Sequence, residues 1–286
     1  MATAPDPAPH VALDASGWVG TVSDIGRRHH RNEDAVAIYA EPVPGSFAAM
    51  VVCDGVSTST DSHLASQAAV GAAIQVLAAA FTDDNIEDGT DDDGTDAWLG
   101  VAERALAQSV LAADEAASEV ADPDDPTPPS CTFAGALICD GFVIGGNVGD
   151  SRVYWLPDSD PAGAAQLGAD DSMATELALR GVPIAQAEAS PNAHAITRWL
   201  GRESPDMLTP RAAHLAASEP GWVVVCSDGL WNYCSAAADQ WDLLQRTRAM
   251  AGESPVAIAE GLVAFANSQG GADNISVALA RVIPAD

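Results

Sequence analysis

The 286-residue sequence contains no lysine. Its 12 basic side chains are all arginines, and they stand against 41 aspartates and glutamates, so the formal net charge is −29. Proteins hold nucleic-acid phosphates with basic surfaces, so this composition argues against a nucleic-acid partner. If a phosphorylated ligand binds, metal ions and a few arginines would have to neutralise its negative charge locally. The electrostatic field of the acidic protein as a whole would oppose binding. We expect the remaining acidic residues to form a solvated shell.

Cysteines and long apolar runs are also scarce. The cysteines are odd in number and form no Cys-x-x-Cys pair: Cys53, Cys131, Cys139, Cys226 and Cys234. This argues against a disulfide scaffold or zinc site. Cys53 and Cys226 lie inside apolar runs, so we expect them to be small buried side chains. The longest apolar run, within residues 68–81, is too short for a membrane span. Residues 1–15 lack a basic segment followed by an apolar core, so we expect a cytoplasmic location.

Three aspartates stand at the ends of apolar runs that are far apart in the sequence. Asp54 follows residues 48–53, Asp228 follows residues 222–227, and Asp273 precedes a run that begins at Ile275. A short, continuous apolar run is typical of a strand covered on both faces. Three carboxylates would repel one another without a cation. The pattern therefore predicts a centre for hard divalent metal ions, which prefer oxygen ligands.

The pattern along the chain predicts one domain over residues 17–286, preceded by a mobile tail over residues 1–16. We expect the acidic segment 82–96 to be a solvated loop. It does not match a calcium-binding loop, because its acids are adjacent rather than alternate. Residues 157–220 predict a flap-like excursion with one helix at 173–180 and a short strand at 196–200.

Regular elements are predicted elsewhere. Strands are expected at 18–22, 35–39, 48–53, 132–139, 142–147, 152–156, 222–226 and 274–282, and further helices at 63–81, 97–120, 236–251 and 255–268.

Other polar features have more than one interpretation. Asp140-Gly141 has a strand on both sides, so it predicts a two-residue hairpin turn. Asp150, taken alone, is typical of a turn. Residues 27–31 hold three arginines and two histidines, which suits either an anion site or a charged hairpin loop paired to neighbouring acids.

Five segments, in order, resemble the motifs of the bacterial-type metal-dependent serine/threonine phosphatases of the protein phosphatase 2C (PPM) family. They are Gly26 to Asp34, Val52 to Gly55, Asn147 to Arg152, Cys226 to Trp231 and Gly270 to Asn274. The resemblance implies an α+β fold: two antiparallel β-sheets packed as a central sandwich, with helices on both sides. It also implies hydrolysis of phosphoserine and phosphothreonine on proteins, the substrates of a serine/threonine kinase.

The resemblance further implies a role for each matching residue. Asp54 would bridge two Mg or Mn ions, and a water or hydroxide between the ions would attack the phosphate. The implied ligands and supporting residues are Glu33 through water, the Gly55 carbonyl, Asp228, Asp273, Asp150 at a third metal position, and Asn274 as a hydrogen-bonding residue beside Asp273.

The sequence departs from the family pattern at the phosphate-binding arginine, which is His29 here. His29 itself, Arg28 or Arg31 would then bind the phosphate. His29 or His30 would protonate the leaving alkoxide, because no histidine follows Asp54-Gly55. The replaced arginine leaves open a weakly active or inactive signalling module that binds phosphoproteins. A two-metal hydrolase of small phosphate esters is a third alternative, since nothing in the sequence identifies a protein-sized groove.

Overall fold

The apolar runs of the sequence form strands that are covered on both faces. In β4 (Phe47–Cys53), Ala49 and Val51 pack toward helices, while Met50 and Val52 pack toward another sheet. In β12 (Gly221–Cys226), alternate residues are divided between two cores in the same way. Successive side chains of a strand point to opposite faces, so a run without polar residues requires cover on both. The two buried strands predicted here are confirmed.

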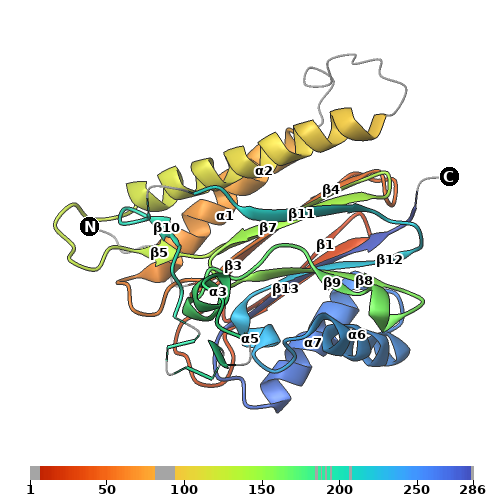
Figure 1. Cartoon of the computed structure of the whole chain (residues 1–286). Coiled ribbons are helices and arrows are strands. Elements are labelled where there is room, and N and C mark those ends of the chain that lie inside the picture. The colour runs from red at the N-terminus through yellow and green to blue at the C-terminus, as the bar shows by residue number, and fades with distance from the viewer. Residues whose placement is uncertain are drawn as a thin grey trace.

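The computed structural model describes residues 7–80, 94–183, 186–187, 189–190, 192–193, 195–205 and 208–284. Within them, two antiparallel sheets stack face to face (Figure 1). One runs in the order β1 (His10–Ala15), β2 (Val19–Asp24), β13 (Ile275–Val282), β12, β8 (Arg152–Pro157) and β9 (Ala165–Gln166). The other runs β11 (Arg211–Ala216), β7 (Phe142–Val148), β6 (Phe133–Cys139), β4 and β3 (Ala35–Ala40), and a short pair joins β10 (Leu200–Gly201) to β5 (Ser130–Cys131).

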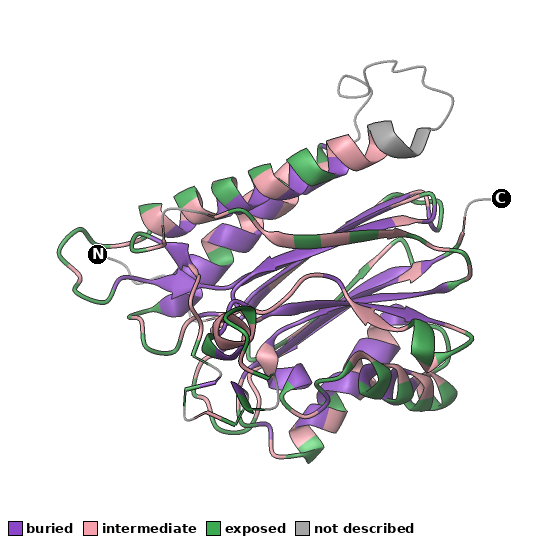
Figure 2. Cartoon of the chain, in the orientation of Figure 1, coloured by how far each residue is buried: buried purple, intermediate pink, exposed green. Residues whose placement is uncertain are grey.

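Helices cover the outer face of each sheet, which completes the predicted α+β sandwich. Figure 1 shows α1 (Ser62–Ala78) and α2 (Gly94–Glu119) over the β4 sheet, and α6 (Ala237–Ala251) and α7 (Pro255–Ser268) over the β12 sheet. The shorter helices are α3 (Met173–Leu179), α5 (Asp228–Trp231) and the 3₁₀ turn η1 (Pro161–Gly163). In Figure 2 the strands are mostly buried, while the outer helices expose one side.

Two predicted irregular regions contain strands. The mobile tail predicted over residues 1–16 is wrong for His10–Ala15, which form β1 along β2; residues 1–6 lie outside the described residues. The turn that joins the two strands is at Ser16 and Gly17, both with positive φ. The excursion predicted over 157–220 is wrong for Arg211–Ala216, which pair with β7 as the edge strand of the second sheet. Both strands are polar or alanine-rich edges, so neither has the apolar pattern of a buried strand.

Smaller boundaries also differ from prediction. Of the predicted acidic loop at 82–96, residues 82–93 lie outside the described part, and residues 94–96 belong to α2. The strand predicted at 196–200 is reduced to a bridge between Ile196 and Ser172 and the two-residue β10. The hairpin at Asp140-Gly141 is confirmed, with φ of 45° and 82° at the two turn residues.

The cysteines are free, and Cys53 and Cys226 are buried as predicted. Cys131 and Cys234 are also buried, and Cys139 is partly exposed. No single described helix is both long and apolar enough to cross a bilayer; α6 and α7 satisfy that test only as a pair, bent by 119°.

Candidate metal centre

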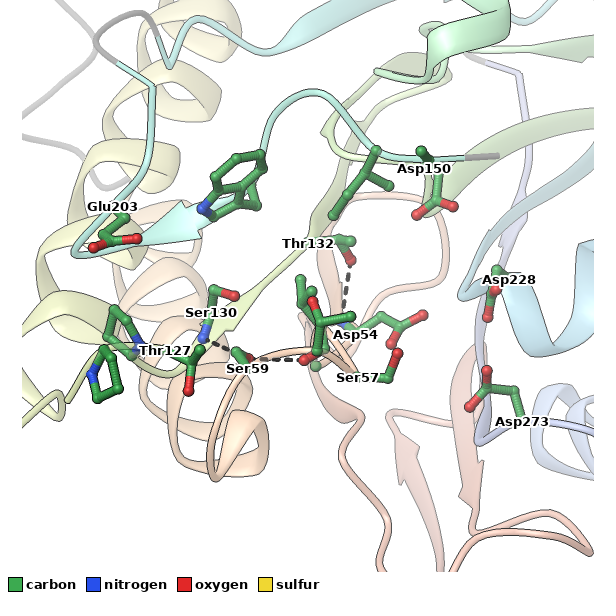
Figure 3. Close-up of a pocket in the computed structure, with 18 residues that line it drawn as sticks. Asp54, Ser57, Ser59, Thr127, Ser130, Thr132, Asp150, Glu203, Asp228 and Asp273 are labelled. Atoms are coloured by element: carbon green, nitrogen blue, oxygen red, sulfur yellow. Dashed lines mark hydrogen bonds between the residues drawn. The ribbon is translucent and has the colours of Figure 1, made fainter. Parts of the chain in front are cut away.

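A pocket of about 500 Å³ brings together the acidic residues that the sequence places at strand ends (Figure 3). Asp54 follows β4, Asp150 lies between β7 and β8, Asp228 follows β12, and Asp273 precedes β13. The antiparallel pairing of β12 with both β8 and β13 brings three of these segments to one end of the sandwich. Gly55 also lines the pocket. Five of the six predicted metal-binding positions therefore meet there.

Backbone hydrogen bonds hold Asp54 at the pocket. Its carbonyl oxygen accepts from the Thr132 N–H at 2.7 Å, and its own N–H donates to Thr132 Oγ1 at 3.1 Å. Thr132 Oγ1 lies 2.7 Å from Ser151 Oγ, next to Asp150. This chain of contacts fixes Asp54 relative to the turn that carries Asp150.

The short helix α5 positions Asp228 in its first turn. A side chain at Gly229 is excluded, since an added Cβ would lie 1.9 Å from the Asn274 carbonyl oxygen. Asn232 Nδ2 donates to Asp228 Oδ2 at 3.0 Å, and Trp231 Nε1 donates to the Asp150 carbonyl oxygen at 2.8 Å. The helix thus holds Asp228 and Asp150 in one arrangement.

Asn274 ties the segment around Glu33 to β13. Its Oδ1 accepts from the Glu33 N–H at 2.8 Å, and its Nδ2 donates to the carbonyl oxygens of Ile25 and Arg31 at 2.9 and 3.1 Å. The Glu33 carbonyl oxygen lies so close to Gly55 that a Cβ there would be 2.8 Å away. The backbone of Glu33 is therefore beside the pocket, although the residue is not among those that line it.

The predicted phosphate-binding residues lie outside the pocket lining. His29 Nε2 is 3.2 Å from Asp273 Oδ1, so this ring is at the edge of the acidic group. Arg31 Nη1 bonds Asp61 Oδ1 at 3.0 Å and lies 3.3 Å from His63 Nδ1, while Arg28 is exposed. His29 therefore joins the basic segment to a pocket carboxylate.

Burial and mutual repulsion raise the pKa values of the pocket carboxyl groups. Burial, with further repulsion from Asp34 and Asp228, raises the pKa of Asp54 well above its ordinary value. Burial and neighbouring carboxylates raise the pKa of Asp150 to about 8 and that of Asp228 to about 6. Such groups favour a bound cation, which replaces the protons and removes the repulsion.

Asp34 joins this electrostatic group, and its position was not predicted from the sequence. It is 4% exposed, Ser227 Oγ donates to its Oδ2 at 2.8 Å, and its Oδ1 has no hydrogen-bond partner. Burial raises its pKa to about 7, with Asp228 adding to the effect. The sequence feature that could have indicated Asp34 is its place at the end of the Asn-Glu-Asp segment. Nothing in the sequence separates its role from that of Glu33.

The donor set fits a hard divalent ion. The groups are carboxylates and a backbone carbonyl, and Asp228 Oδ1 is buried without a hydrogen-bond partner. Oxygen ligands of this kind suit Mg and Mn. Within the described residues, however, no three His, Cys, Asp or Glu side chains stand in a ready-made metal-binding geometry. The carboxylates surround the pocket, and a cation would have to draw them closer.

The pocket continues past the acidic group along a wall that was not predicted. Ser57, Ser59 and Thr127 line it together with Trp199 and Glu203. The segment after Asp54-Gly55 leads into α1, whose N-cap residue, Asp61, makes no side-chain cap hydrogen bond. The pairing of β10 with β5 that brings residues 199–203 here involves two residues on each strand, too few to recognise in a sequence.

Comparisons with known proteins point to one family. The family model described as protein phosphatase 2C matches residues 25–267. Protein phosphatase PhpP of Streptococcus pneumoniae is 26% identical over 263 residues, covering 91% of this chain and 96% of the relative. The S. agalactiae serine/threonine phosphatase has a TM-score of 0.71 at 23% identity, covering 93% of this chain and 98% of that one. A catalytic domain of the phosphatase PstP, solved with two manganese ions, has a TM-score of 0.65 at 24% identity, covering 92% and 97%.

Proposed function

We propose that this chain, which belongs to the protein phosphatase 2C family, hydrolyses phosphoserine and phosphothreonine on proteins. The observation that carries the proposal is the meeting of Asp54, Asp150, Asp228 and Asp273 in one pocket. These residues come from four remote segments, and nothing in the folding of the sandwich alone requires an acid at each of them. The names of two relatives support the choice of substrate: PhpP of Streptococcus pneumoniae is named a protein phosphatase, and Stp of Listeria innocua, 28% identical over 262 residues, is named a serine/threonine phosphatase.

The proposed cofactors are two Mg or Mn ions, with a third at Asp150. When bound, such ions supply positive charge to a phosphoryl group and acidify a water molecule. The two manganese ions of the PstP catalytic domain support this number. In this chain Asp54 would contact both ions, the Gly55 carbonyl and the water network of Glu33 would serve one, and Asp228 and Asp273 would serve the other.

The chain's own residues would position the substrate and manage the proton. Asn274 holds the backbone of Glu33 and Arg31, so it would orient the segment that carries His29. His29 lies against Asp273 at the pocket edge, and we assign it to the leaving serine or threonine oxygen or to the phosphate, with Arg28 and Arg31 as its alternates. The cytoplasmic location and the opposing kinase stay predictions.

Phosphate release from two substrates tests the proposal. The purified chain is incubated with manganese and either a phosphothreonine peptide or a small chromogenic phosphate ester. Metal-dependent release from the peptide supports the proposal. Binding of the peptide without release would instead identify a phosphoprotein-binding module, and turnover of the small ester alone would identify a small-ester hydrolase.

The role of His29 is tested by the pH profile of His29→Gln. We expect a change in the alkaline limb, because a proton donor fails once it has lost its proton, or a change in peptide affinity. If both match the parent enzyme, His29 has neither role.

A further inference from the structure

The pocket extends well beyond the predicted metal ligands. Figure 3 places Glu203 at the opposite end of the pocket from Asp228 and Asp273, with Ser57, Ser59 and Thr127 between. Trp199, which is partly exposed, also lines the pocket. A phosphate group with its metal ions would occupy only the acidic end. The other end is free for the residues that flank the phosphorylated side chain.

Beyond the acidic group, the pocket is lined by the aromatic ring of Trp199 and the carboxylate of Glu203. Glu203 is exposed, and within the described residues no ion pair or hydrogen bond engages its carboxylate. None of the described residues that line the pocket is an arginine or a histidine. Glu203 therefore has no cation of this chain to neutralise it there. An aromatic ring and a carboxylate in the lining of one pocket suit a guanidinium or ammonium group with a long apolar stem.

The segment that carries Trp199 and Glu203 is held in place. β10 pairs with β5, and the Gly201 N–H donates to Asp114 Oδ1 of α2 at 2.8 Å. Arg202 Nη1 donates to the Asp122 carbonyl oxygen at 3.0 Å, so its side chain is engaged outside the pocket. These bonds are made by the residues between Trp199 and Glu203 in the sequence, and they reduce the ordering cost of binding.

The hydroxyl-rich part of the lining is held in the same way. Val56 N–H donates to the Ser130 carbonyl oxygen at 2.9 Å, and the Ser130 N–H donates to Ser59 Oγ at 3.2 Å. Thr60 N–H donates to the Thr127 carbonyl oxygen at 2.8 Å. Two loops that line the pocket are thereby joined into one polar wall. Glu203 is the charged group at the end of the pocket away from Asp228 and Asp273.

We propose that Trp199 and Glu203 form a subsite that selects substrates with an arginine or lysine near the phosphorylated residue. The proposal rests on the phosphatase function proposed above, and it names the class of phosphoprotein. The side-chain stem would pack on the Trp199 ring, and its cationic head would meet Glu203. The net charge of −29 acts in the same direction, because it draws basic segments toward the protein and repels acidic ones.

The test compares the full chain with Glu203→Gln on a set of phosphothreonine peptides. An arginine is placed in turn at each position on either side of the phosphothreonine, in an otherwise alanine background. Affinity is measured by fluorescence anisotropy with manganese, and kcat/KM by phosphate release. We expect the parent protein to prefer one arginine position over alanine by about three- to ten-fold, with the preference weakening in high salt.

Glu203→Gln should lose most of this preference, and Glu203→Arg should favour a glutamate at the same position. Glu103→Gln is the matched control: it removes the same charge from an exposed residue of α2 that does not line the pocket, and it should keep the parent preference. Equal arginine preference in the parent and in Glu203→Gln would overturn the subsite. Absence of phosphate release with the binding preference intact would contradict the proposed phosphatase function and leave the subsite supported.

Discussion

At the scale of single residues, Asp34 is the group whose contribution is least visible in the sequence. It is buried next to Asp54 and Asp228, and one of its carboxylate oxygens has no partner. An amide at this position could still accept from Ser227 Oγ, so the fold should tolerate the change.

We therefore predict that Asp34→Asn folds but binds manganese about 10- to 100-fold more weakly, as is usual when a supporting carboxylate is lost from a metal site. Titration calorimetry measures the affinity. Asp140→Asn, at the exposed hairpin turn, serves as the control and should bind as the parent does. Parent-like manganese affinity in Asp34→Asn would remove Asp34 from the site.

Gly229 gives a second prediction at this scale. A methyl group there would meet the Asn274 carbonyl oxygen at 1.9 Å and its carbonyl carbon at 2.8 Å. Backbone atoms cannot move aside cheaply, so Gly229→Ala should lower the free energy of unfolding by about 2–4 kcal/mol. Gly71→Ala in α1 meets nothing within 4 Å and should stabilise the chain by about 0.5–1 kcal/mol. Urea unfolding distinguishes the two, and a neutral Gly229→Ala would show that α5 and β13 can separate.

At the scale of elements, the excursion after β8 is held by one buried carboxylate. Asp171 is fully buried, accepts from the Gly149 N–H at 3.1 Å, and pairs with Arg198 at 3.2 Å and with Arg211 at 2.5 Å. Arg211 belongs to β11 and Arg198 lies just before Trp199. This cluster therefore connects the pocket wall to the second sheet.

Asp171→Asn should loosen that connection. Both arginines are partly exposed and can turn to water, so we expect a loss of about 1–3 kcal/mol rather than the larger cost of a fully buried unpaired charge. Limited proteolysis should cut residues 172–210 faster than in the parent. Glu176→Gln, which removes the weaker partner of Arg211, should change the rate little. Unchanged proteolysis of Asp171→Asn would contradict the proposed anchor.

How far the elements were predictable depended on their position in the sheets. β4 and β12 are central, so their continuous apolar runs predicted them and the acids that follow. β1 and β11 are edges with polar or alanine-rich sequences, and they were missed. Asp54, Asp228 and Asp273 were predicted as one group because their strand ends carry a local signal. Trp199 and Glu203 were not, because their place depends on the pairing of β10 with β5.

At the scale of the whole molecule, the pocket acids should make the metal-free protein less stable as the pH rises. The pKa values of Asp228, Asp34 and Asp150 are about 6, 7 and 8 in the folded chain, above the ordinary value near 4 of the unfolded chain. The folded state then binds more protons than the unfolded state between these limits. The stabilisation of the folded state by these protons is fully present below about pH 4. It is lost as the pH rises through 6 to 8, where the three carboxyl groups ionise in the folded chain.

In chelator, the Tm should therefore fall by about 5 °C or more between pH 5.5 and 8.5. Saturating manganese should remove the decline, since metal binding favours the ionised carboxylates. Asp228→Asn in chelator should show a shallower decline, which separates this effect from the general repulsion of the acidic surface. A Tm that is flat or rises with pH in the metal-free parent protein would contradict the repulsive carboxylate group.

The central claim is metal-dependent phosphoprotein hydrolysis at Asp54. The most direct measurement is the initial rate of phosphate release from a phosphothreonine peptide by the full chain and by Asp54→Asn, each with manganese and with chelator. We predict turnover only with manganese, and a reduction of about 10³-fold or more in Asp54→Asn, since the ions supply several kcal/mol of stabilisation. Turnover that survives chelation, or an Asp54→Asn enzyme as active as the parent, would contradict the account.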